Sequence, residues 1–451
     1  MAPRGLPVFD SDFGRAEAER LLWRAGFGPR RGDANALAAL GLHGAVHSLL
    51  NPQAYAARGP EPHDSKGNPL VPRDAFGHDH LWWLDRMVRG NQPLVERMTL
   101  IWHDWFATSQ FTVNNQPLML NQNQLFRQSW AGSFQDLLPN VTQDPAMLLW
   151  LNGNKNRVGK PNENYAREMM ELFTLGAYQG YGEQDVREQA RALSGFRNDD
   201  DKNLGPVNFR YDPTYHDNDS KTIFGQTGNF GWQDACSLAL QNAAHPPFFV
   251  RKLWGYFIPL SELDARTQQV LEQTYLSSGY RIAPVLEAIL VHPSLYDGPR
   301  IVKPPVVYTA GLLRALGRGI DSSDWIDLDE AAGQRLFYPP NVSGWDDDRW
   351  LDTQTFRGRW ALVADALKPF ALDPATAPRQ RSNTPDAVVD RALAFWDNPE
   401  VTRPTYLALR GFARLALADA GTDSVKLATY PTLVENALRQ LIAVSPDLLT
   451  C

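Results

Sequence analysis

The chain has 451 residues, 43% of them hydrophobic and 21% charged, a composition that excludes wholesale disorder and predicts one large core with an appendage, or two domains. The formal net charge is −7 and no run of lysine or arginine occurs, so nucleic acid is not expected as a partner. The two cysteines, Cys236 and Cys451, are too few for a disulfide framework or a CxxC metal site.

No apolar run is long enough to span a membrane, and residues 1–10 lack the apolar stretch of a secretory signal. As it stands, the sequence predicts a cytoplasmic location, with export of a leader-bearing precursor as the alternative. The fourteen tryptophans are a surplus that can fill a core or form flat platforms for sugars, and we expect most of them in the core. The sequence leaves cofactor and oligomeric state unknown.

Helical periodicity recurs along the chain, and the fold class we predict is mainly α: a large, irregular, multi-helix single core with long loops and a C-terminal helical appendage. Helices are expected at 15–25 and 33–40, then at 93–106 after a loop at 55–78 that is rich in Pro, Gly and His. Further helices are predicted at 120–138, 162–176, 184–194, 233–243, 246–258, 264–277, 282–291, 304–317 and 353–367.

Two long segments lack helical periodicity. Residues 197–232 combine Asp, Asn and Gly with short β-prone pieces, which predicts an irregular loop with one hairpin; residues 321–350, which contain the pair Pro339–Pro340, are expected to be irregular as well. Loops of this length are often functional. A Pro-rich linker at 369–386 would separate a core domain, residues 1–368, from a C-terminal helical unit, residues 387–451, with helices near 386–397, 403–419 and 430–443.

The most informative segment for chemistry is residues 162–176. On a helix, Glu168 would lie at the margin of an apolar stripe, where partial desolvation raises the pKa of a carboxyl group towards that of a general acid. Arg167 and Glu171 are four residues apart and can pair, which would keep Glu171 ionised. Two carboxylates in unlike surroundings are typical of an acid and base pair. The alternative is that Glu168 is a structural carboxylate held by an arginine from another helix.

Two further groups carry candidate residues. His103 lies between Trp102 and Trp105, on the same predicted helix as Glu96, and could be a catalytic imidazole or a satisfied core histidine. In the irregular segment, His216, Asp217 and Lys221 bring imidazole, carboxylate and amine together, and their alternative role is to stabilise a turn. Arg187 and Arg191 share one helical face and could hold an anionic group. Serine-hydrolase, P-loop and dinucleotide-binding motifs are missing in their proper contexts.

Over roughly residues 15–368 the chain resembles the DUF1800 family. The likeness is carried by several motifs in the same order: Arg20–Gly28 (RLLWRAGFG), Trp102–Phe106 (WHDWF), Asn164–Leu172 (NYAREMMEL), Gly180–Val186 (GYGEQDV), Ala190–Gly195 (ARALSG), His216–Asp217 with Lys221, and Pro339–Trp345 (PPNVSGW).

The resemblance implies a bacterial protein, often exported with a leader and often encoded beside a DUF1501 protein, which makes a DUF1501-like protein a possible partner. It implies no reaction. The chain departs from the family where Phe173 replaces the His of many relatives, where Gly182 replaces Thr, and in having no leader. The first departure weakens a metal site and the second removes a helix cap.

The leading functional hypothesis is an acid–base enzyme that hydrolyses a carbohydrate or another polar polymer. Glu168 would be the acid and Glu171 or Asp217 the base, assisted by His103 and His216. The residues expected to bind substrate are Trp102, Trp105, Arg167, Arg187, Arg191, Lys221 and Trp345. The rivals are a non-catalytic scaffold or accessory protein for a DUF1501-like partner, and a metal-dependent oxidoreductase using carboxylates and histidines. No metal ligand is assigned.

Overall fold

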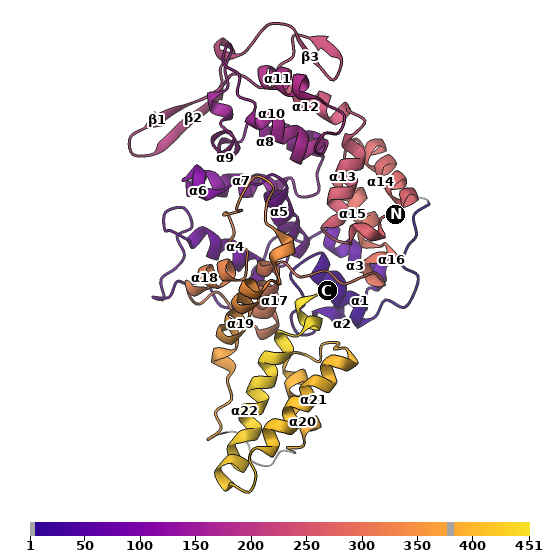
Figure 1. Ribbon diagram of the computed structural model, residues 1–451, viewed down its shortest axis with the longest axis vertical. Coiled ribbons are helices and arrows are strands. Elements are labelled where there is room, and N and C mark those ends of the chain that lie inside the picture. Colours follow the sequence, from indigo (N-terminus) through magenta and orange to yellow (C-terminus); the bar gives the residue numbers. More distant parts are fainter. Residues whose placement is uncertain (1–4, 377–382) are drawn as a thin grey trace.

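The computed structural model describes residues 5–376 and 383–451, and within them it is mainly α-helical (Figure 1). The helices in the first third of the chain are α1 (Arg15–Arg24), α2 (Asp33–Ala38), α3 (Gly41–Leu50), α4 (His78–Arg89), α5 (Pro93–Trp105), α6 (Gln110–Val113), α7 (Gln116–Gln128), α8 (Phe134–Thr142) and α9 (Pro145–Trp150). Proline at the first helical position starts α5 and α9, where its missing N–H costs no hydrogen bond.

The middle of the chain contains every β-strand of the described residues. In chain order its elements are α10 (Asn164–Glu168), the π-helix η2 (Met169–Thr174), α11 (Glu183–Ala192), β1 (Phe196–Asp201), β2 (Gly205–Tyr211), β3 (Lys221–Ile223) and β4 (Gln226–Gly228). Each sheet is one antiparallel hairpin, β1 with β2 and β3 with β4. We expected one hairpin in residues 197–232. The structure has two there, and only the first residue of β1 lies outside that range.

The remaining elements complete the core and form the C-terminal lobe. They are α12 (Trp232–Gln241), α13 (His245–Gly255), α14 (Ala265–Ser277), α15 (Ile282–Leu290), α16 (Pro293–Tyr296), α17 (Pro305–Leu316), α18 (Asp324–Ala331), α19 (Thr353–Leu367), α20 (Pro385–Phe395), α21 (Arg403–Ala418), α22 (Ser424–Ala443) and α23 (Pro446–Leu449). Helices α20, α21 and α22 lie side by side at one end of the molecule (Figure 1). None of the helices in the described ranges is both long and apolar enough to cross a bilayer.

Two buried apolar clusters meet along α5. Trp102 and Trp105 of α5 belong to the first cluster, together with side chains from α8 and from α10 to α15. Leu100 of the same helix belongs to the second, which continues through α4, α17 and α19. Leu409 of α21 and Leu438 of α22 are also buried in the second cluster, so the C-terminal helices share their apolar contacts with the core.

Several of the predicted elements are confirmed and several are wrong. The helix expected at 353–367 has those bounds in α19. The single helix expected at 120–138 is wrong, because α7 ends at Gln128 and a turn separates it from α8. The segment 321–350 contains α18, which the sequence pattern did not predict, and α3, α4 and α9 were also missed. Of the predicted linker, residues 377–382 lie outside the described residues.

The last described residues return to the first helix. The backbone of Cys451 exchanges two hydrogen bonds with Ile301, each 2.9 Å long, and Arg24 Nε donates to the Cys451 oxygen at 3.1 Å. Figure 1 accordingly shows the C-terminus among α1, α2 and α17, well away from the tip of the C-terminal lobe. This return forms one wall of a cavity that α1 and α17 also line.

Candidate functional site

The predicted helix at 162–176 contains a π-helix directly after Glu168. In this segment the Leu175 N–H donates to the Met170 oxygen, five residues back, at 2.9 Å. The sequence pattern placed Glu168 and Glu171 on an ordinary α-helix, so the local geometry differs from the expectation. Short π-helical turns within helices are frequent at functional sites.

Side chains from two other helices hold the last turn of η2. Trp105 Nε1 of α5 donates to the Phe173 oxygen at 3.0 Å, and Lys252 Nζ of α13 donates to the Leu172 oxygen at 2.8 Å. Carbonyls at the end of a helix lack intrahelical partners, and these donors supply them. The segment carrying Glu168 and Glu171 is thereby tied to α5 and α13.

Glu168 and Glu171 have unlike surroundings. Glu168 is half-buried and has no hydrogen-bond or ion-pair partner among the described residues; burial raises its pKa and the charge of Glu171 adds to the rise. Glu171 Oε1 lies 3.8 Å from Arg167 Nη1, so the predicted pair of these two residues is present. Arg167 Nη1 and Nη2 also donate hydrogen bonds to the two carboxylate oxygens of Glu183, at 2.9 and 2.8 Å. Arg187, 63% exposed, lies 3.9 Å from Glu163, and its charge also acts on Glu183.

His216, Asp217 and Lys221 form a separate cluster against α11. Burial alone would raise the pKa of Asp217, but Arg191 binds both carboxylate oxygens, at 2.8 and 3.1 Å, and holds that pKa below its usual range. His216 Nδ1 lies 3.0 Å from the Ser194 oxygen. Lys221 Nζ donates to the backbone oxygens of Asp217 and Asp219. His216, Asp217 and Lys221 each have at least one polar partner, and the contacts with Arg191 and Ser194 fasten the irregular loop to α11 and the residues that follow it.

His103 lies deep in the core. Its ring is packed edge-on against Trp83 and Phe337 and in contact with Trp345, with centroid distances of 5.5–5.6 Å. Burial without a charged partner lowers the pKa of His103 to about 3, so the imidazole is neutral at physiological pH. His103 Nε2 has no hydrogen-bond partner among the described residues. A neutral, enclosed ring of this kind is a core histidine.

Glu96, on the same helix as His103, is a buried structural carboxylate. Burial would raise its pKa, but Arg127 and Arg86 contact it and hold the pKa below its usual range. Trp83 Nε1 also donates a hydrogen bond to Glu96 Oε2, at 3.1 Å. Among the described residues, no group of three or more His, Cys, Asp and Glu side chains is arranged to hold a metal ion.

The three tryptophans predicted to bind substrate differ in exposure. Trp102 and Trp105 are fully buried, and their rings contact protein on all sides, so they supply core packing and no stacking surface. Trp345 is only partly buried. It lines a cavity of about 280 Å³ together with Tyr338 and Trp350. The indole N–H groups of Trp345 and Trp350 are buried and have no acceptor among the described residues.

The segment with Trp345 and the segment with Glu168 meet at the end of α5. Asp104 accepts a hydrogen bond from the Trp345 N–H at 2.9 Å, while the next residue, Trp105, holds the Phe173 oxygen of η2. Consecutive residues of α5 therefore hold the loop that carries Trp345 and the end of η2, five residues after Glu168. His103 and the His216 cluster occupy other settings. None of the predicted catalytic residues lines the cavity at Trp345.

The sequence pattern gave no indication of several polar residues at this meeting point. Asp104 also accepts from the Tyr256 hydroxyl at 2.6 Å; burial raises the pKa of Asp104, and the charge of Asp347 pushes it the same way. Lys252 lies over the Trp105 ring at 4.6 Å, and burial lowers its pKa to about 8. Asp104 stands inside the WHDWF motif and could have been singled out. Lys252 and Tyr256 belong to a helix with ordinary apolar periodicity, which gives no such signal.

Comparison with protein-family models shows the family to which this sequence belongs. A model described as a protein of unknown function, DUF1800, matches residues 20–449. The chain belongs to the DUF1800 family. The match extends through α20–α23, so the family likeness takes in the C-terminal helices that the motifs up to residue 368 did not reach. No curated protein and no solved structure matches this DUF1800 protein.

Proposed function

We propose that this DUF1800 protein is an acid–base hydrolase that acts on a carbohydrate or another polar polymer, with Glu168 as the proton donor. The observation that carries the proposal is the contrast between Glu168, unpartnered among the described residues and with a raised pKa, and Glu171, which faces Arg167. A proton donor must stay protonated near the working pH, whereas its partner must stay ionised. The raised pKa of Glu168 suits the proton donor, and the arginine beside Glu171 suits its partner.

Glu171 suits the role of base better than Asp217, the other candidate. Both oxygens of Asp217 accept hydrogen bonds from Arg191, which leaves that carboxylate little capacity to take a proton from water. Glu171 has a single arginine nitrogen at 3.8 Å and is partly exposed. In the proposed reaction Glu168 protonates the leaving oxygen, and Glu171 removes a proton from the attacking water.

The cavity at Trp345 supports a sugar-like substrate. It combines aromatic rings with polar side chains such as Arg349 and Gln354, and a sugar presents both an apolar face and hydroxyl groups. Its link to the Glu168 segment runs through Asp104 and Trp105 at the end of α5. The polymer would extend from this aromatic cavity towards the two carboxylates.

The test is release of reducing ends from soluble xylan, carboxymethyl cellulose and peptidoglycan fragments. Glu168→Gln should lower the rate by about 100-fold or more, because it removes general acid catalysis. Since the pKa of Glu168 is raised, activity should decline on the alkaline side as that group ionises. Glu163→Gln is the matched control: it changes a carboxyl group on the same segment that also contacts Arg167. Equal rates for Glu168→Gln and wild type, or no cleavage of any polymer, would refute the proposal.

A second candidate function is an accessory protein that binds a partner such as a DUF1501-like protein. The observation that favours it is the exposed apolar side of α21, where Leu407 is 50% and Leu415 is 66% exposed. Binding of the purified DUF1501-like protein should be lost in a Leu407→Lys, Leu415→Lys double variant and retained in Glu168→Gln. Retention of binding by the double variant would dismiss this surface.

A further inference from the structure

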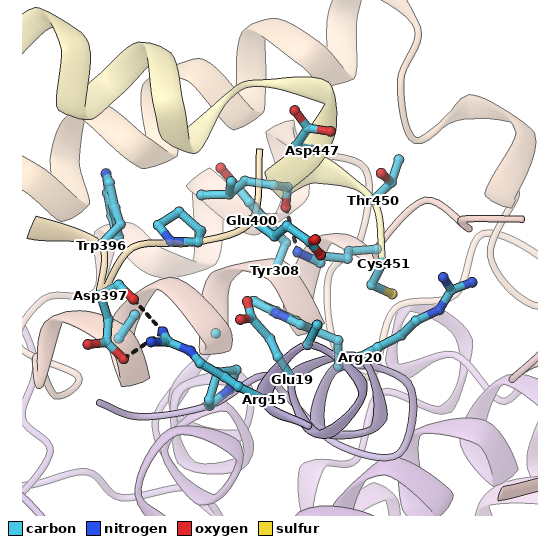
Figure 2. Close-up of a pocket in the computed structure, with 18 of the residues that line it drawn as sticks. Arg15, Glu19, Arg20, Tyr308, Trp396, Asp397, Glu400, Asp447, Thr450 and Cys451 are labelled. Atoms are coloured by element: carbon cyan, nitrogen blue, oxygen red, sulfur yellow. Dashed lines mark hydrogen bonds and ion pairs between the residues drawn. The ribbon is translucent and has the colours of Figure 1, made fainter. Parts of the chain in front are cut away.

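A cavity of about 190 Å³ lies where α1 and α17 meet the turn at 396–400 and the residues that follow α22. Figure 2 shows Glu19 entering from α1 and Glu400 from the opposite wall, with Cys451 beside them. Its lining includes the aromatic side chains of Trp23 and Tyr308. Neither Glu168 nor Trp345 lines this cavity, so a role for it does not depend on the proposed hydrolase activity.

Ion pairs at the rim of this cavity join the C-terminal segments to the rest of the chain. Arg15 contacts Asp397 at 3.0 Å, a contact drawn in Figure 2, and Arg300 contacts Asp447 at 3.3 Å. The first pair joins α1 to the turn at 396–400, and the second joins Asp447 to the segment that precedes Lys303. Arg24 of α1 holds the end of the wall formed by residues 447–451 through its hydrogen bond to the Cys451 oxygen.

Lys303 is the buried amine of this cavity. The residue is only 3% exposed, and its Nζ donates to the Leu448 oxygen at 2.7 Å while lying 3.6 Å from the centre of the Trp23 ring. Leu448 is its only hydrogen-bond acceptor among the described residues. Burial lowers the pKa of Lys303 to about 8, so a substantial fraction is the neutral, nucleophilic amine in mildly alkaline solution.

We infer that this cavity binds a small aromatic aldehyde, which Lys303 captures as an imine. The Nζ lone pair forms a bond to the carbonyl carbon, and the carbonyl oxygen leaves as water with the two amine hydrogens, so no oxidant or reductant is needed. A lysine that burial keeps partly unprotonated is the kind of amine that forms such imines. Once the imine is protonated, its N–H can keep the hydrogen bond to Leu448.

Size and charge support this ligand class. A cavity of about 150 Å³ accommodates benzene, so the volume here suits one substituted ring. The partly exposed ring of Trp23 borders the cavity and can pack against such a ring, whereas Tyr308 is almost fully buried beside it. The charges of Cys451 and Glu19 act on Lys303 and raise its pKa. Acidic and basic side chains both line the cavity, among them Glu19, Glu400, Arg20 and Arg300, so a neutral carbonyl compound meets no unbalanced charge there.

The test is reductive trapping of the full chain with benzaldehyde and cyanoborohydride, followed by peptide mass mapping. Lys303 should be modified at least about tenfold faster than the exposed Lys66 and Lys155 at pH 7.5, because more of its amine is unprotonated. Its rate should level off above about pH 8, whereas that of an ordinary lysine rises to about pH 10. Labelling in proportion to surface exposure would overturn the inference.

Two comparisons separate the cavity from the effect of burial. Lys252 is an internal control, because burial lowers its pKa to about 8 as well but it does not line this cavity; it should remain unmodified. Ala315→Phe places a ring in the cavity wall and should slow modification of Lys303. Modification of Lys252 at the rate of Lys303, or an unchanged rate in Ala315→Phe, would show that the cavity does not bind the aldehyde.

Discussion

The Asp104 carboxylate accepts a hydrogen bond from the backbone N–H of Trp345, 2.9 Å away and 241 residues further along the chain. Gly344, just before Trp345, approaches the same carboxylate so closely that a Cβ atom there would collide with it, and its φ of 94° favours glycine. The Asp104 side chain and Gly344 thus fix the position of the irregular loop that carries Trp345 against the end of α5.

Gly344→Ala should therefore displace this loop. The new methyl group meets both the Asp104 carboxylate and an unfavourable φ, so the free energy of unfolding should fall by about 2 kcal/mol or more in a denaturant titration. Ser343→Ala, one residue earlier and exposed, should change it by less than about 0.5 kcal/mol. Equal stability of both variants would mean that the loop is not held at Gly344.

Arg127→Met should be strongly destabilising. Glu96 is almost fully buried and depends on Arg127 for contacts of 2.8 and 2.9 Å, so the variant leaves a buried charge poorly compensated. We expect a loss of about 3 kcal/mol in the free energy of unfolding. The control is Arg187→Met, which removes an exposed arginine whose nearest carboxylate oxygen is 3.9 Å away and should have little effect.

The low pKa of Glu96 also makes a pH-dependent contribution. Because the folded-state pKa lies below the unfolded one, this stability is fully present above the unfolded pKa of about 4.3 and is lost as the pH falls through the folded pKa. Arg127→Met should weaken that dependence. If the free energy of unfolding of the variant falls with decreasing pH as steeply as that of wild type, Glu96 does not make this contribution.

His103 should remain neutral down to about pH 4. Burial lowers its pKa to about 3, so its NMR signals should not shift between pH 8 and pH 4 in the folded protein. In urea, the same histidine should titrate near pH 6.5. A midpoint above pH 5 in the folded state would show that the ring is accessible and would restore it as a candidate catalytic group.

The difference between the pKa values of His103 in the folded and the unfolded chain destabilises the protein in acid. Below about pH 6.5 His103 becomes protonated in the unfolded chain but stays neutral in the folded chain. The free energy of unfolding therefore falls by about 1.4 kcal/mol per pH unit for this one group. The contribution is fully present above pH 6.5 and is lost as the pH falls towards 3. His103→Leu should therefore lose less stability than wild type between pH 7 and pH 4.

Lys252→Met should loosen the π-helix. The variant removes the donor to the Leu172 oxygen, so the amides of Leu175 and Gly176 should exchange faster with deuterated solvent. Arg251→Met changes an exposed neighbour on the same helix and should leave exchange unaltered. If both variants exchange alike, Lys252 does not support the segment that carries Glu168.

The position of some helices follows from local sequence. The bounds of α19 match those expected, because periodic apolar residues and chain-breaking neighbours act within a few residues of one another. Interruptions within a helical segment are harder to predict. Gly132 and its neighbours divide the helix expected at 120–138. The π-helical turn after Glu168 is held by donors from α5 and α13, which no local pattern reveals.

By itself the sequence determined the helical class, the family, the absence of lysine and arginine runs and the pairing of Arg167 with Glu171, all of which depend on composition, on motifs or on residues at most one or two turns apart. Only the tertiary structure decided that His103 is an enclosed neutral ring, that Asp217 is neutralised by Arg191, and that Asp104 joins the Trp345 loop to α5. The reason is physical: the pKa and accessibility of a side chain depend on desolvation and on charges brought close by distant segments, and only packing brings those segments together.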